Sequence, residues 1–154
     1  MTDTSTTATL QTGHVGLNVT DLGRSLDFYR TIFGFEIAAH SEADGRGFAL
    51  LTLDGQIVLT LWKQSSGTFP ADRPGLHHLS FQVDSIDLVR AYEARVREAG
   101  GDILHDGIVP HGEGMDSGGL YFTDPDGIRL EVFSPSGAAV AAAPTPGAPT
   151  CGFF

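Results

Sequence analysis

The sequence predicts an α+β fold in which two βαβββ repeats pair into one curved mixed sheet around a concave cup, with two helices on the outer face. Three observations support this. Residues 14–19 (HVGLNV) and 78–83 (HLSFQV) share one alternating pattern, which is typical of strands with a single apolar face. Each is followed by a helix-forming segment that ends at glycine, and then by a hairpin. Because the same three parts recur in the same order, we expect two copies of one unit.

The opening strand of each repeat has one polar and one apolar face. Alternate residues of a strand point to the same side, so the first, third and fifth positions share a face. These positions hold His14, Gly16 and Asn18 in the first strand, and His78, Ser80 and Gln82 in the second. The opposite, apolar face of each strand must be covered, and we expect a helix to cover it.

The expected helices and hairpins follow in order. Residues 25–33 and 88–99 carry apolar side chains at helical spacing, and glycines follow directly at 34 and 100. Residues 48–53 and 56–62 form a hairpin around Asp54-Gly55, and residues 120–123 and 128–133 form its counterpart. The second repeat is longer before its hairpin, and the extra residues fall in the segment 105–119.

The domain boundaries follow from composition. We expect a flexible segment at 1–12, one folded domain at 13–134 with repeats at about 13–64 and 76–134, and an Ala/Pro-rich arm at 135–154. The arm is unsuited to a packed element, yet it ends in two aromatic residues after Cys151. A lone cysteine cannot form an intramolecular disulfide, and the role of this thiol stays open.

Charge and hydropathy exclude several classes of partner. The 154-residue chain has a formal net charge of −10, which repels phosphate backbones and anionic lipid, so we expect neither nucleic-acid nor membrane partners. It has no apolar stretch of about 18 residues and no recognisable signal peptide. We therefore expect a cytoplasmic protein that acts on a small molecule.

Three residues form a candidate metal site. His14 and His78 begin equivalent strands, and Glu131 lies in the closing strand with its neighbours Leu130 and Val132 on the helix side. A lone strand histidine is usually a surface or core residue, but the repeat places these two together. Two imidazoles and one carboxylate suit Fe(II), with Mn, Zn or Ni as further possibilities, and leave positions open for substrate.

Four segments carry a resemblance to a known family. Residues 14–22 (HVGLNVTDL), 25–29 (SLDFY), 77–83 (HHLSFQV) and 121–131 (YFTDPDGIRLE) resemble the vicinal oxygen chelate superfamily, which includes glyoxalases, bleomycin resistance proteins and extradiol dioxygenases. The resemblance covers about residues 13–134 and implies His14, His78 and Glu131 as metal ligands. Leu59 is taken as the repeat partner of Glu131, where glyoxalase I would need a second glutamate, so glyoxalase I itself is disfavoured.

The function expected from the resemblance is that of a metal-dependent dioxygenase-type oxidoreductase, assembled as a homodimer. A glyoxalase-like isomerase or lyase and a fosfomycin-type transferase are alternatives. The transferase would need a basic cradle for phosphonate, and only Arg129 and Lys63 lie near the expected cup. A metal-free drug-binding resistance protein is the third alternative.

Further side chains complete the expected site. Tyr121 and His111 are candidate catalytic acids or bases, with His105 as an alternative to His111. His77 is expected to point away from the cup, because it adjoins His78 in a strand. The candidate substrate-binding residues, three aromatic and one cationic, are Trp62, Phe48, Phe133 and Arg129.

Overall fold

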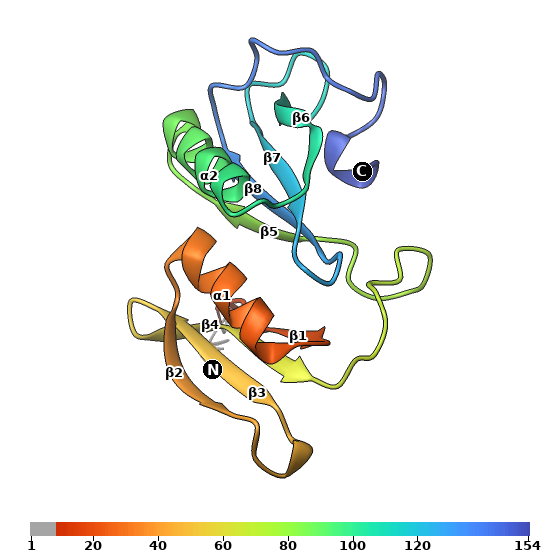
Figure 1. The fold of residues 1–154 in the computed structure, drawn as a ribbon. Helices are drawn as coiled ribbons and strands as arrows, with labels where there is room; N and C mark the ends of the chain where they lie inside the picture. The colour runs from red at the N-terminus through yellow and green to blue at the C-terminus, as the bar shows by residue number, and fades with distance from the viewer. Residues whose placement is uncertain (1–8) are drawn as a thin grey trace, which may run out of the picture.

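The computed structural model describes residues 9–154, and within them the chain forms two four-stranded sheets, each with one α-helix (Figure 1). The first repeat comprises β1 (Val15–Val19), α1 (Leu22–Phe33), β2 (Glu36–Ser41), β3 (Phe48–Leu53) and β4 (Gln56–Lys63). The second comprises β5 (Leu79–Gln82), α2 (Ile86–Glu98), β6 (Ile103–Pro110), β7 (Gly118–Thr123) and β8 (Arg129–Ser134). Short 3-10 turns lie at Ala43–Gly45 and Thr150–Gly152. Most of the expected N-terminal segment lies outside the described residues.

Both repeats have the same strand order. The sheets run β1-β4-β3-β2 and β5-β8-β7-β6, with the first pair of each parallel and the remaining pairs antiparallel. The prediction of two βαβββ repeats is therefore confirmed. The sheet differs from the prediction in one respect: β1 and β5 are edge strands that do not pair with each other, so the chain has two sheets and not one continuous sheet.

The helices begin and end where local chemistry satisfies their free backbone groups. The Asp21 side chain accepts a hydrogen bond from the Arg24 amide at 2.9 Å, and Ser85 caps α2 in the same way. Gly34 ends α1 in the left-handed region at φ 70°, and its N–H donates to the Arg30 carbonyl. Each helix starts two or three residues before the expected start, because the capping residues precede the apolar pattern.

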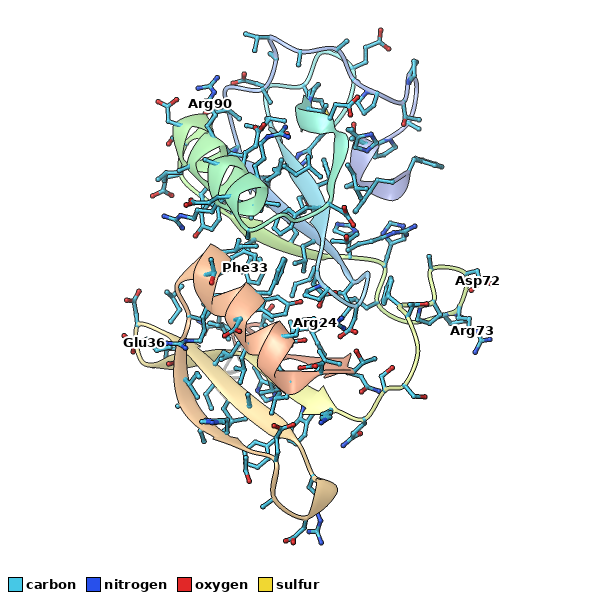
Figure 2. The ribbon with its side chains drawn as sticks, in the orientation of Figure 1. Arg24, Phe33, Glu36, Asp72, Arg73 and Arg90 are labelled. Atoms are coloured by element: carbon cyan, nitrogen blue, oxygen red, sulfur yellow. The ribbon has the colours of Figure 1, made fainter. Side chains whose placement is uncertain are left out.

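The two repeats are joined by a shared aromatic core. Phe33 at the end of α1 packs against Phe81 of β5 with ring centroids 4.8 Å apart, and it also contacts Tyr92 of α2. Figure 2 shows Phe33 at the boundary between the two halves. Buried residues of both repeats belong to one hydrophobic cluster. The repeats therefore associate through their helix-covered sides, because this buries the aromatic rings from water.

Polar links reinforce this boundary. The buried Tyr29 hydroxyl donates to Asp124 at 2.9 Å, and Arg24 forms a 3.0 Å ion pair with Asp126. The Asp124 carboxylate also accepts the amides of Asp126 and Ile128, which fixes the turn between β7 and β8. Burial raises the pKa of Asp124, and these hydrogen bonds oppose the rise.

The packing leaves one face of each sheet without a helix, here called its open face. The C-terminal arm lies against the second sheet on the side opposite α2 (Figure 1). The arm is tethered, contrary to the expectation that its composition would not pack: Gly137 and Ala138 donate to Asp116, and the buried Thr150 hydroxyl donates to the Pro110 carbonyl at 2.7 Å. Among residues 9–154, no helix is long and apolar enough to cross a membrane.

Candidate metal centre

The open face of the second sheet gathers side chains from three neighbouring strands. Glu131 of β8 pairs with Ser80 of β5 on one side and with Tyr121 of β7 on the other. Its neighbours Leu130 and Val132 are buried in the core, so alternation directs Glu131 to the open face as predicted. The carboxylate is nevertheless only 3% exposed, which requires compensating partners.

Two histidines supply those partners, one on each carboxylate oxygen. His111 Nε2 lies 2.6 Å from Glu131 Oε1, and His78 Nε2 lies 3.6 Å from Oε2. The other ring nitrogen of His111, Nδ1, is 3.0 Å from the Ser117 hydroxyl, which fixes the orientation of the imidazole. One oxygen of Glu131 is thus held by a hydrogen bond, while the other faces His78 at a longer distance.

The environment favours the charge states that a metal ligand needs. Burial raises the pKa of Glu131, but hydrogen bonding led by His111 outweighs burial, so the net pKa lies below its usual range. Burial lowers the pKa of His78 more than the attraction of Glu131 raises it. At neutral pH an ionised carboxylate therefore faces a neutral imidazole, and both forms can bind a divalent cation.

Tyr121 and His105 lie beside this group. Tyr121 is fully buried with its hydroxyl towards the Glu131 carboxylate, whereas the buried Nε2 atom of His105 has no hydrogen-bond partner. The two rings are 5.6 Å apart. Burial, followed by the negative charge of Glu131, raises the pKa of Tyr121 far above neutrality, so its hydroxyl stays protonated.

His14, the third predicted metal ligand, lies elsewhere. It is exposed immediately before β1 and lines a hollow with residues 11–13 and 55–58. Among residues 9–154, no group of three His, Cys, Asp or Glu side chains is arranged to hold a metal ion. The expectation that the two repeats of one chain bring His14 beside His78 is wrong, because the repeats associate through their helices and not through β1 and β5.

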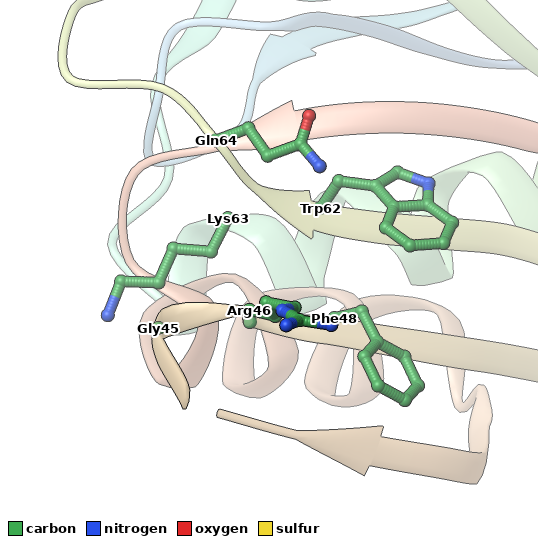
Figure 3. Close-up of a pocket in the computed structure, with 7 residues that line it drawn as sticks. Gly45, Arg46, Phe48, Trp62, Lys63 and Gln64 are labelled. Atoms are coloured by element: carbon green, nitrogen blue, oxygen red, sulfur yellow. The ribbon is translucent and has the colours of Figure 1, made fainter. Parts of the chain in front are cut away.

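The predicted substrate-binding residues are divided between the two sheets. Phe48 and Trp62 face each other across β3 and β4, with ring centroids 6.1 Å apart, and line a hollow on the first sheet (Figure 3). Arg129 and Phe133 flank Glu131 in β8, and Phe133 packs against His111 at 5.1 Å. Lys63 is paired with Glu42 at 3.0 Å, so it does not join Arg129 in a basic cradle within the chain.

Two details of the sequence interpretation need correction. β5 begins only at Leu79, so strand alternation does not separate the two histidines before it; His77 lies on the same side as His78, with their Nδ1 atoms 2.8 Å apart. The repeat partner of Glu131 is Thr60, not Leu59, because Thr60 pairs with Gly16 as Glu131 pairs with Ser80. The reason is a register irregularity in β4 opposite Leu51 and Thr52, which adds one residue to this strand relative to β8. Neither position offers a second glutamate.

Sequence reasoning did not assign Phe154 to the site. Its ring lies 4.7 Å from the Tyr121 ring and 5.6 Å from the His78 ring, measured between centroids. The aromatic end of an otherwise Ala/Pro-rich arm was the available signal. Cys151 lies in the turn that carries Phe154 to this face, and it belongs to no metal-binding group among the described residues.

Comparison with known proteins identifies the family. The family model described as Glyoxalase/Bleomycin resistance protein/Dioxygenase superfamily matches residues 11–132, which span both repeats. The chain belongs to this superfamily. Members of the superfamily bind small molecules, and a divalent metal is bound in some of them.

Similar sequences include proteins of different activities. The chain is 33% identical to the uncharacterised protein YaeR of Escherichia coli, over 80% of this chain and 95% of that protein. It is 30% identical to a probable trivalent organoarsenical cleaving enzyme of Bacillus subtilis, over 78% and 77% of the two chains. It is 29% identical to the catechol-2,3-dioxygenase of Bacillus subtilis over 79% of this chain, but spans only 40% of that enzyme.

Solved structures share the fold. A glyoxylase/bleomycin resistance protein/dioxygenase domain from Frankia has a TM-score of 0.70 and 30% identity, with 82% of this chain and 98% of that chain covered. The fosfomycin resistance protein FosX of Listeria monocytogenes, in a complex with Mn(II) and sulfate, has a TM-score of 0.61 and 20% identity, with 82% and 93% covered. This second likeness concerns the fold alone.

Proposed function

We propose that this protein is a metal-dependent, dioxygenase-type enzyme that binds one divalent ion, with Fe(II) as first choice, through His14, His78 and Glu131. The observation that carries the proposal is the Glu131 carboxylate, which is only 3% exposed yet ionised, with the neutral imidazole of His78 3.6 Å from its Oε2 atom. A buried anion beside a neutral imidazole fits a cation better than it fits a closed core.

The third ligand comes from a second copy of the chain in this proposal. Each sheet leaves one face open, and His14 and the His78–Glu131 pair lie on different repeats of one chain. In a two-fold dimer, the first repeat of one chain lies against the second repeat of the other chain. The symmetry produces two such contacts, and therefore two sites. The same pairing would add Phe48 and Trp62 as an apolar wall, and it explains why one chain alone has an incomplete site.

Other residues of the chain orient the proposed metal ligand and the substrate. His111 holds Glu131 Oε1 and leaves Oε2 directed towards His78, which sets the orientation of the ligand carboxylate. A bound divalent ion would supply Lewis acidity and, if iron, a route for electrons to O2. Tyr121 keeps its proton at neutral pH, so its hydroxyl can donate a hydrogen bond to a substrate oxygen that gains negative charge.

One relative favours oxygen chemistry over the alternatives. A catechol-2,3-dioxygenase is similar in sequence over 79% of this chain, which spans 40% of that enzyme. A phosphonate-binding transferase is less favoured, because Lys63 is paired with Glu42 and stands on a different sheet from Arg129.

The decisive experiment is elemental analysis of anaerobically purified protein, followed by O2 uptake with a panel of catechols after Fe(II) loading. We expect about one metal per chain and substrate-dependent uptake. His78→Ala should lose both, while His40→Ala, which removes an exposed histidine of β2, should lose neither. Zn, Mn or Ni without O2 uptake would favour an isomerase or transferase, and failure to bind any metal would leave a ligand-binding protein.

A further inference from the structure

The rings of His77 and His78 are joined by a hydrogen bond. Their Nδ1 atoms lie 2.8 Å apart, and the two rings are nearly perpendicular, at 81°. The residues stand on the same side because β5 begins only at Leu79, so strand alternation does not separate them. At this distance one ring donates its Nδ1–H and the other accepts through a lone pair.

The C-terminal ring of the chain holds this pair in place. Phe154 packs edge to face against both imidazoles, with its centroid 6.0 Å from His77 and 5.6 Å from His78. These contacts restrict the rotation of both rings. The two Nδ1 atoms therefore stay face to face, although His77 is an exposed residue.

The surroundings of the two rings decide which one donates. If His77 were the donor, the proton of His78 would be on Nε2, where the Oε2 atom of Glu131, at 3.6 Å, is too distant to accept a hydrogen bond. If His78 is the donor, the proton of His77 is on its own Nε2 atom, and water can accept it because this residue is exposed. An unpaired donor in a partly buried site costs free energy, so the second arrangement is favoured.

This arrangement is the one that a metal ligand needs. A proton on Nδ1 of His78 leaves a lone pair on Nε2, the atom that faces Glu131. Ligating histidines commonly donate their other ring N–H to a neighbouring acceptor, which fixes the tautomer and the orientation of the ring. The other imidazole beside Glu131 is held at the same atom, because Nδ1 of His111 lies 3.0 Å from the Ser117 hydroxyl. Each imidazole next to the carboxylate is thus oriented through Nδ1 by a neighbour of its own.

We propose that His77 is a positioning residue, whose Nδ1 atom accepts a hydrogen bond from Nδ1–H of His78 and so keeps the Nε2 lone pair of His78 directed towards Glu131 for metal binding. The inference rests on the proposed function, because it concerns a ligand of the same site. It assigns a role to a residue outside the proposed triad. Removal of such an outer-shell partner typically weakens metal binding about 10- to 100-fold.

The test compares two replacements of His77 that have the same shape, in the full-length protein with Zn(II) as the probe. The Oδ1 atom of asparagine stands as many bonds from Cβ as Nδ1 of histidine and can accept the hydrogen bond, whereas leucine offers no acceptor. In calorimetric titration we expect His77→Leu to bind Zn(II) about 10- to 100-fold more weakly than the wild type, and His77→Asn to bind within about threefold of it. His40→Leu, which removes an exposed histidine of β2, should bind as the wild type does.

A second readout depends neither on metal nor on activity. Nitrogen NMR spectra distinguish the protonated from the unprotonated nitrogen of each histidine ring. In the metal-free wild type and in His77→Asn we expect His78 as the Nδ1–H tautomer. In His77→Leu we expect a mixture with the Nε2–H tautomer, because the acceptor is gone.

Equal zinc affinity in the wild type, His77→Leu and His77→Asn would overturn the proposal, and so would an equal loss in both variants. In either case an acceptor at position 77 would make no difference to the site. An Nε2–H tautomer of His78 in the metal-free wild type, together with normal zinc binding, would refute only the role of His77. A wild type that binds no zinc but shows the Nδ1–H tautomer only when residue 77 can accept a hydrogen bond would refute the proposed metal site and not this role.

Discussion

On the open face of the first sheet, Thr60 stands where the second sheet has Glu131, and Leu50 stands where the second has Tyr121. The strand pairing around these positions is the same in both repeats. Thr60 is buried beneath Trp62, whose indole N–H donates to its hydroxyl at 3.0 Å. Glu131 instead faces two imidazoles. The same strand arrangement thus presents an aromatic surface in the first repeat and a cluster of ionisable side chains in the second.

Neither repeat is therefore sufficient for the proposed chemistry. The first contributes His14 and apolar surface, and the second contributes the carboxylate, His78 and the Tyr121 hydroxyl. Because the repeats of one chain associate through α1 and α2, their open faces do not meet within that chain. Substitution of the residues that differ between the two open faces should therefore affect metal binding and catalysis unequally.

The largest effect is expected from Glu131→Ala. Loss of the only carboxylate of the proposed triad should weaken metal binding about 100-fold or more, since even outer-shell partners are worth 10- to 100-fold. Metal titration followed by elemental analysis measures it. Thr60→Ala changes the equivalent position of the other repeat and should bind metal normally; equal loss in both variants would contradict the assigned asymmetry.

Tyr121→Phe should lower kcat about 100-fold, because a hydrogen-bond donor aimed at a developing negative charge commonly contributes at least that much. Steady-state O2 uptake with catechol measures the change. Metal content should be unaffected, since the hydroxyl is not a proposed ligand. An unchanged kcat would show that the buried hydroxyl only fills space, as Leu50 does in the first repeat.

Subunit mixing tests whether the two open faces meet between chains. His14→Ala and His78→Ala should each lack metal, yet their coexpression should restore about one quarter of the wild-type sites. The reason is that half of the randomly assembled dimers are mixed, and each mixed dimer has one intact site. Metal content and activity after coexpression measure this, and no recovery at all would contradict a site shared between copies.

The smallest effect concerns the boundary between the repeats. Tyr29→Phe leaves the buried Asp124 oxygen without its donor and should reduce the free energy of unfolding by about 1–3 kcal/mol. Urea denaturation measures it. Tyr92→Phe is the matched control, because Tyr92 is only partly buried on α2 in the same aromatic cluster. A similar decrease in the free energy of unfolding in both variants would show that the hydrogen bond to Asp124 does not stabilise the fold.

Much of the fold could be predicted because it depends on the spacing of apolar residues that are close in the sequence. The alternation in residues 78–83 and the apolar spacing in residues 88–99 depend only on strand and helix geometry. The orientation of Glu131 could be predicted for the same reason, since Leu130 and Val132 assign the core face. The orientation of the His77 side chain could not be predicted, because β5 begins one residue later than the alternating pattern indicated.

Local sequence patterns are enough to specify the two βαβββ units, their helix-covered faces and the residue types available for chemistry. Which of these residues meet depends on the tertiary structure, which places His111 on Glu131, Phe154 on Tyr121, and His14 away from both. The physical reason is that local periodicity fixes which face a side chain takes, whereas the association of the repeats follows from burial of a shared aromatic core. That burial is a property of the whole chain and leaves no local pattern.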